Sequence, residues 1–165
     1  MSIMTTNLQQ LFRHDLWANR LILDASAGLT PDQVDATVVG TYVSLGRTLF
    51  HLIASIDSYA ARLAVRPRLL VNDDAVAVPS NGHLRAILES AGPELIELAG
   101  STTGVDTVEV MRPDGLIAVP GWIILVQAID HGREHRTHIA TILTQLGIEP
   151  PDMDGWTFMN ASDQA

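Results

Sequence analysis

Residues 121–147, GWIILVQAIDHGREHRTHIATILTQLG, constrain the fold more than any other part of the chain. Their apolar and histidine side chains recur at helical rather than alternating spacing. The segment reaches a stop at Gly147, ahead of Pro150 and Pro151. One face carries, in order, Ile124, Ala128, His131, His135, His138 and Ile142. The pattern predicts one long amphipathic helix, which can bury its apolar stripe only against other elements.

Three further segments show the same periodicity, at residues 5–29, 44–65 and 80–100. The third of these contains Gly92 and Pro93, which should kink or split the helix. Between the first two, LTPDQV has the arrangement of a capping box and predicts a short helical turn. The chain is therefore expected to have four long helices.

Strand structure is expected only at residues 105–120, where β-favouring residues flank a Pro-Asp-Gly turn. They predict a short hairpin or extended crossover before the last helix. The predicted fold class is all-α, a four-helix bundle, in which sites are usually built by side chains of facing helices. We expect a single domain over residues 1–165, of which residues 151–165 form a tail. Three large side chains of this tail need cover from the bundle or from a second subunit: Trp156, Phe158 and Met159.

Composition excludes several classes of function. Ten arginines and no lysine against nineteen acidic residues give a net charge of −9, so we expect no nucleic-acid partner. The chain has no cysteine, which excludes a catalytic thiol supplied by the protein. The most apolar stretch is interrupted by Pro120 and Gly121 and is too short to span a bilayer. We therefore expect a cytoplasmic protein without a membrane partner.

Three of the six histidines lie close together in the last predicted helix. His131 and His135 are four residues apart, so their side chains lie one above the other and can bind one ion from the same side. Such a pair is a weak signal by itself, because a solvated helix face can collect two histidines by chance. A third ligand is needed from another element.

His51 is the candidate for that third ligand. It lies within TLFHLIAS, where apolar neighbours require a histidine to be paired, coordinated or at the edge of the stripe. A hydrogen-bonded edge histidine is the alternative, but together with His131 and His135 we favour coordination. Three imidazoles suit Zn²⁺, Ni²⁺ or Fe²⁺ and leave positions open for water or substrate.

The remaining histidines have weaker claims to a metal. His138 extends the same helix face by one turn, and is a hydrogen-bond partner of a ligand, an alternative ligand or a surface residue, in that order of preference. His14 and His83 lie near polar neighbours close to helix starts. We expect both of them to be solvated.

Other polar residues near the histidines allow two interpretations each. Asp57 and Glu134 could accept hydrogen bonds from ligands or accept a proton, although charged residues on bundle helices are more often solvated. Arg136 points away from the histidine face and is expected to contact another helix or a second subunit. Trp17 is expected in the core or at an interface.

These features resemble the DinB/YfiT-like family over nearly the whole chain. LWANRLI, residues 16–22, is similar to the signature of the family's first helix. The segment from LTPDQV to SYAARL resembles its turn and second helix, where a histidine at the position of His51 is a metal ligand. AIDHGREHRTHIATILTQLG resembles its last helix and assigns the other two ligands to His131 and His135. Thr137 and His138 depart from the usual Gly and Gln, which puts the surroundings of the ligands in question.

The resemblance implies an up-down-down-up bundle, commonly a homodimer, that binds a divalent ion such as Zn²⁺ or Ni²⁺. It also suggests a reaction, because some relatives transfer low-molecular-weight thiols. The leading hypothesis is a transferase in which a metal-bound thiolate attacks an electrophilic small molecule. The alternatives are a metal-dependent hydrolase and a non-catalytic bundle that binds a metal or small ligand. The sequence identifies neither the substrate nor the thiol.

Overall fold

The computed structural model describes residues 6–71, 73 and 75–162. The ends of the predicted domain, residues 1–5 and 163–165, lie outside this part of the chain. Within it, the chain is mostly helical, with one small antiparallel sheet. The elements are α1 (Asn7–Ser26), α2 (Pro31–Val34), α3 (Leu45–Leu63), α4 (Asn81–Ser101), β1 (Thr107–Arg112), β2 (Gly115–Pro120), α5 (Gly121–Gln145) and α6 (Gly155–Ser162).

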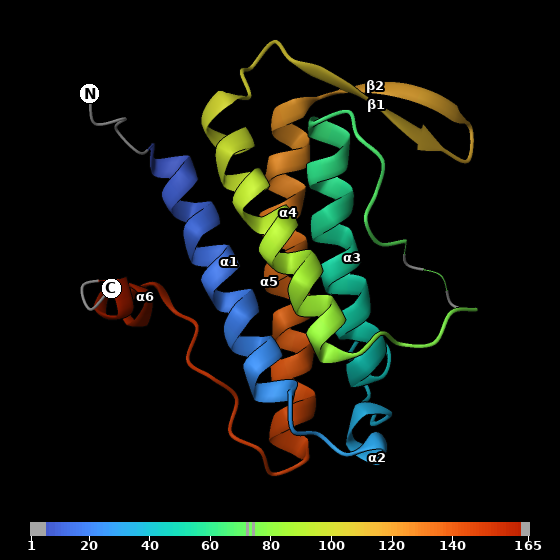
Figure 1. Ribbon diagram of the computed structural model, residues 1–165, viewed down its shortest axis with the longest axis vertical. Coiled ribbons are helices and arrows are strands. Elements are labelled where there is room, and N and C mark those ends of the chain that lie inside the picture. Colours follow the sequence, from blue (N-terminus) through green and yellow to red (C-terminus); the bar gives the residue numbers. More distant parts are fainter. Residues whose placement is uncertain (1–5, 72, 74, 163–165) are drawn as a thin grey trace.

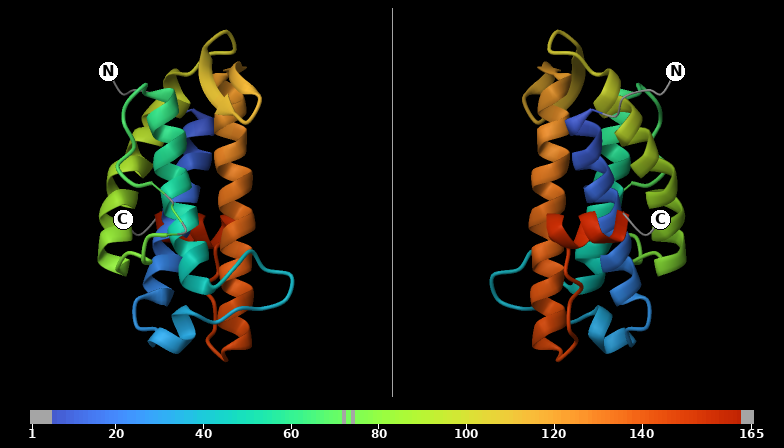
Figure 2. Two further views of the ribbon diagram at one scale, coloured as in Figure 1. Left: turned by 90° about the vertical axis from the view of Figure 1, so that its right-hand side faces the viewer. Right: turned by 90° about the vertical axis from the view of Figure 1, so that its left-hand side faces the viewer.

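The four long helices pack side by side. Figure 1 shows α1 and α5 running down the page and α3 and α4 running up it. Helix α1 packs chiefly on α4, and α3 packs on both α4 and α5. The hairpin β1–β2 lies beyond one end of the bundle, and α6 crosses the outside of α1 (Figure 2). This arrangement places the middle of α3 against the middle of α5.

Local sequence signals determine where the helices begin. The side chains of Thr6, Ser44 and Ser80 accept hydrogen bonds from the backbone three residues on, which satisfies N–H groups left free at a helix start. The predicted capping box before the short helix α2 is present, between Thr30 and Gln33.

Gly92 and Pro93 were expected to kink or split α4, and the predicted split is wrong, because the helix continues unbroken through Pro93. Proline removes the hydrogen bond to the carbonyl four residues earlier, here that of Glu89. Both Glu89 and Pro93 are exposed, so water can satisfy this carbonyl on the outer face. The buried face of the helix, which includes Leu88 and Leu95, is uninterrupted.

The predicted hairpin is present, but the tail differs from expectation. Valines of the hairpin, Val108 and Val119 among them, pack at the end of the core. The tail contains the unpredicted helix α6, and only one of its three large apolar side chains, Phe158, is half-buried on the bundle. Trp156 remains 74% exposed and Met159 49% exposed. No helix in the described part of the chain has the length and apolar character that crossing a membrane requires.

Candidate metal centre

The structure brings His51 of α3 together with His131 and His135 of α5. The Nε2 atom of His131 lies 2.9 Å from that of His51 and 3.1 Å from that of His135. The two histidines of α5 meet because they are one helical turn apart. His51 meets them because α3 packs along α5. The three residues each offer one ligand atom, and these atoms all lie within 4.8 Å of one another.

The chemistry of this cluster fits a cation better than it fits three free imidazoles. A neutral imidazole has one N–H and one lone pair, so a nitrogen that faces two others can donate a proton to only one of them. A divalent ion removes this conflict by accepting all three lone pairs. Tetrahedral zinc with Zn–N bonds of about 2.0 to 2.1 Å would require nitrogens about 3.3 Å apart, close to the two distances found. The three histidines are thus positioned to bind a metal ion.

The surroundings of the cluster favour neutral histidines. Burial, followed by the neighbouring His51, lowers the pKa of His131 to about 4. Burial, followed by His131, His51 and His138, lowers the pKa of His135 to about 3. Both imidazoles are therefore neutral at physiological pH, the form in which histidine binds metals.

Aromatic rings and a small cavity surround the cluster. The ring of Tyr42, from the segment before α3, lies 4.7 Å from that of His51 and 4.9 Å from that of His135. Beside the cluster is a cavity of about 290 Å³ that His51 and His131 help to form. We name it the α3 cavity; its lining residues are His51, Ala54, Ser55, Ser58, Tyr59, Arg62, Arg68 and His131.

His138 lies next to the cluster but outside it. Its ring centroid is 5.5 Å from that of His135, and it does not belong to the group of converging ligand atoms. The Nδ1 atoms of His135 and His138 are both buried and have no hydrogen-bond partner among the described residues. Metal-binding histidines usually donate their second N–H to a neighbour.

The two carboxylates considered from the sequence lie in very different places. Asp57 is fully buried, and the backbone N–H groups of Leu69 and Leu70 donate hydrogen bonds to its Oδ2 at 2.6 and 3.0 Å. Its Oδ1 is 3.0 Å from Arg66 Nη1. Asp57 thus fixes the segment after α3, and the expectation that it is solvated is wrong. Glu134 is exposed, as expected for a charged residue on a bundle helix.

Arg136 contacts another helix, one of the two alternatives expected from the sequence. Its Nη1 donates to Asp15 Oδ1 at 2.6 Å and to Asn19 Oδ1 at 2.8 Å, and all three residues are buried. The interaction ties α5 to α1 directly beside the histidine-bearing turn. Burial raises the pKa of the Asp15 carboxyl, although Arg136 opposes that shift.

His14 and Trp17 contribute to packing on α1. The expectation that His14 is solvated is wrong, because His14 is half-buried and its Nε2 lies 2.8 Å from the carbonyl oxygen of Met153. Trp17 and Phe158 lie against it, which anchors α6. His83 is exposed, as predicted.

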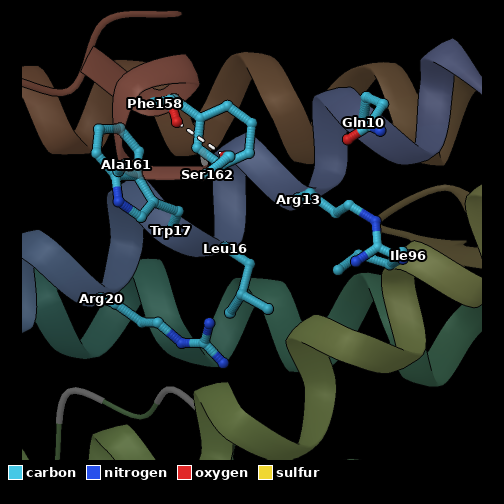
Figure 3. A pocket seen from close by; sticks show the side chains of 9 residues that line it. All are labelled: Gln10, Arg13, Leu16, Trp17, Arg20, Ile96, Phe158, Ala161 and Ser162. Carbon is cyan, nitrogen blue, oxygen red and sulfur yellow. Dashed lines mark hydrogen bonds between the residues drawn. The ribbon is translucent and has the colours of Figure 1, made fainter. Parts of the chain in front are cut away.

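A larger cavity, of about 680 Å³, lies between α1, α4 and α6 (Figure 3). Trp17 and Phe158 border one side of it, and Arg13 lies near Ile96 on the other. None of the three clustered histidines lines this cavity. A small molecule would therefore reach the clustered histidines through the α3 cavity and not through the larger cavity.

Sequence reasoning missed several residues around the cluster: Tyr42, Tyr59, Arg62 and Arg68. The sequence contained a signal for Arg62. Ser55, Ser58 and Arg62 follow His51 by four, seven and eleven residues, a spacing that places all four on one helix face. Tyr42 and Arg68 lie in irregular segments, where spacing does not indicate direction.

A helical protein with three converging histidines from two helices belongs to the class of bundles with a candidate metal centre. The model of the DinB family matches residues 4–164, and the chain belongs to this family. Its fold is similar to the crystal structure of a DinB-like protein from Bacillus cereus ATCC 10987, with a TM-score of 0.67 and 18% identity. That match covers 88% of this chain and 94% of the other. No curated protein matches the chain.

Proposed function

We propose that this protein is a divalent-metal-dependent enzyme that transfers a low-molecular-weight thiol to an electrophilic small molecule. The observation that carries the proposal is the convergence of three histidine Nε2 atoms beside an open cavity. Three protein ligands leave a coordination position for a reactant, which distinguishes reactive from structural sites. The absence of cysteine requires the sulfur to arrive with a cosubstrate.

In this proposal His51, His131 and His135 hold the ion, with Zn²⁺ or Ni²⁺ favoured and Fe²⁺ a further candidate. A divalent ion lowers the pKa of a bound thiol, which makes the sulfur nucleophilic at neutral pH. The protein keeps His131 and His135 neutral and so keeps their lone pairs available. Ser55 and Tyr59 line the adjoining α3 cavity and can orient a reactant there.

Further parts of the proposal concern the architecture. We propose one domain with the up-down-down-up order that the family resemblance implies, acting as a homodimer. His138 is proposed as a neighbour that helps to hold the ring of His135 in place through their ring contact.

Metal analysis tests the site. We expect about one ion per chain in protein purified without a histidine tag or chelator, and loss of that ion in both His51→Ala and His131→Ala. His83→Ala, which changes an exposed histidine, should retain the ion and serves as the control. Absence of the ion from the wild type, even after incubation with zinc or nickel, would contradict the proposal.

A thiol-dependent assay tests the reaction. Zinc- or nickel-loaded protein is incubated with an electrophile such as 1-chloro-2,4-dinitrobenzene and with glutathione, mycothiol or bacillithiol, and conjugate formation is followed. We expect turnover that requires a thiol and disappears in His131→Ala. Turnover of ester substrates without any thiol would instead favour a hydrolase, and bound metal with no turnover would favour a binding protein.

A further inference from the structure

Two arginines of the α3 cavity lie beside the histidine cluster. Arg62, on α3, is half-buried, and Arg68 follows in the segment after the helix. Both line the same cavity as His51 and His131. Among the residues that the structure describes, no ion pair or hydrogen bond is found for either guanidinium, and Arg62 interacts electrostatically with Tyr59.

Acidic residues outnumber arginines in this chain, nineteen to ten, yet no carboxylate pairs with these two guanidinium groups among the described residues. The nearby Arg66 differs, because it contacts both Asp57 and Glu94. Other arginines also form ion pairs with carboxylates: Arg20, Arg85, Arg133 and Arg136. Arg62 and Arg68 are instead close enough to repel each other, and burial together with Arg68 lowers the pKa of Arg62. An anion between them would relieve this repulsion.

We propose that Arg62 and Arg68 bind an anionic group, a carboxylate or a phosphate, of a reactant that occupies the α3 cavity. Guanidinium groups suit this purpose because their planar donors match both anions in a bidentate manner. Ser55 and Ser58 line the same cavity, and their hydroxyls can donate further hydrogen bonds. The inference rests on the proposed function, to which it adds the charge of the reactant.

The backbones of His51 and Arg62 are about three helical turns apart on α3. Arg62 follows His51 by eleven residues, which corresponds to roughly 16 Å along a helix axis. Ser55 and Ser58 occupy the turns between them. Because the side chains of Arg62, Arg68, His51 and His131 line one cavity, a reactant whose anion is bound by the arginines can also reach the histidines. A cavity of about 290 Å³ is at the lower limit of ligand sites, so the reactant must be small.

Anion binding to the metal-free full-length protein tests the proposal independently of the metal. Phosphate and malonate are titrated by calorimetry at constant ionic strength after the metal has been removed with a chelator. We expect each of Arg62→Gln and Arg68→Gln to weaken the binding of at least one anion about tenfold, which corresponds to about 1.4 kcal/mol, because each loses charge-assisted hydrogen bonds to the anion. Comparing the two anions then distinguishes a planar from a tetrahedral group.

Arg112→Gln is the matched control, because Arg112 is exposed at the end of β1 and does not line the α3 cavity. It should bind both anions like the wild type. Circular dichroism must show that each variant is folded, and Arg62→Lys, which keeps the charge, should retain part of the affinity. Equal affinities in the wild type, Arg62→Gln and Arg68→Gln would overturn the proposal, as would no binding of either anion. Neither result would affect the metal analysis.

A second experiment identifies which reactant carries the anion. The cobalt-loaded protein is titrated with 3-mercaptopropionate and with uncharged 2-mercaptoethanol, and thiol binding is followed by the sulfur-to-cobalt absorption band. If the thiol carries the anion, 3-mercaptopropionate binds more tightly and loses this advantage in Arg62→Gln. If the electrophile carries it, the two thiols bind alike in both proteins while the anion titrations still depend on Arg62.

Discussion

His135 shows how a single residue couples stability to pH. It is 4% exposed, and its ring contacts those of His51, His131 and His138. A charged imidazolium at this position would lose its solvation and face other histidines. Its pKa of about 3 lies well below the ordinary value of 6.5 that it regains on unfolding.

The metal-free protein should therefore lose stability as the pH falls below about 6.5. Between the folded and unfolded pKa values the unfolded state binds more protons, so the free energy of unfolding rises with pH. A histidine whose pKa is lowered in this way contributes up to about 1.4 kcal/mol per pH unit in that window. Urea unfolding at pH 7, 6 and 5 measures the slope. We expect a shallower slope for His135→Gln than for the wild type.

The exposed His83 provides the control for this measurement. His83→Gln removes a histidine that the fold leaves in solvent, so it should keep the slope of the wild type. Equal slopes for His135→Gln and the wild type would show that a buried neutral imidazole at position 135 does not control the acid response.

At the scale of elements, α1 and α5 approach closely at Gly132. A Cβ atom added to this glycine would lie 2.9 Å from Asp15 Oδ1 and 3.0 Å from Arg136 Nη1. Both atoms belong to a buried ion pair, so neither can move aside into solvent. The missing side chain of Gly132 thus permits the contact that fixes the histidine-bearing turn of α5 against α1.

Gly132→Ala should destabilise the protein. Alanine favours a helix over glycine by about 1 kcal/mol, but overpacking a buried site costs about 1 to 3 kcal/mol, and here it also disturbs a buried charge pair. We expect a net loss of about 1 to 2 kcal/mol in the free energy of unfolding, measured in urea. Weaker binding of zinc should accompany this loss.

Gly82→Ala is the matched substitution, because Gly82 lies in α4 and an added Cβ would have no neighbour within 4 Å. There the alanine should be neutral or stabilising by a few tenths of a kcal/mol to about 1 kcal/mol. A Gly132→Ala protein as stable as Gly82→Ala would mean that the close approach of α1 and α5 imposes no constraint.

The elements differ in how far the sequence predicts them. The long helices were predictable because each carries a periodic apolar stripe, and the hairpin was predictable from its turn residues. Helix α6 was missed because it is short, and its contacts with His14 and Trp17 are tertiary.

The pairing of His131 with His135 follows from spacing, and the apolar neighbours of His51 made it a candidate, but only the packing of α3 on α5 brings the three together. The partners of Arg136 lie more than a hundred residues away, beyond the reach of any local pattern.

At the scale of the whole molecule, charge is distributed unevenly. The net charge of −9 disfavours anions in general, yet the α3 cavity contains two arginines beside a potential cation site. The field of the whole protein therefore opposes anionic ligands, whereas this cavity favours them. Such an arrangement favours anion binding at the α3 cavity.

A second feature of the whole molecule is an apolar groove between α1 and α5, on the side of α5 that faces away from the histidine cluster. We name it the α1–α5 groove, and it is lined by Leu8, Leu11, Trp122, Leu125, Val126, Ile129, Asp130 and Arg133. Trp122 is 48% exposed and Val126 is 57% exposed. Exposed apolar surface of this kind commonly marks an interface. We predict that this groove is the contact surface of the proposed homodimer.

Light scattering coupled to size-exclusion chromatography should therefore give twice the mass of one chain for the wild type. Val126→Glu places a charge in the centre of the α1–α5 groove and should shift the protein to the monomer, because an unpaired charge is costly to bury in an interface. Val105→Glu makes the same change at a valine that is 87% exposed and outside the groove, and should remain dimeric. A dimer that persists unchanged in Val126→Glu would place the interface elsewhere, and a monomeric wild type would refute the homodimer itself.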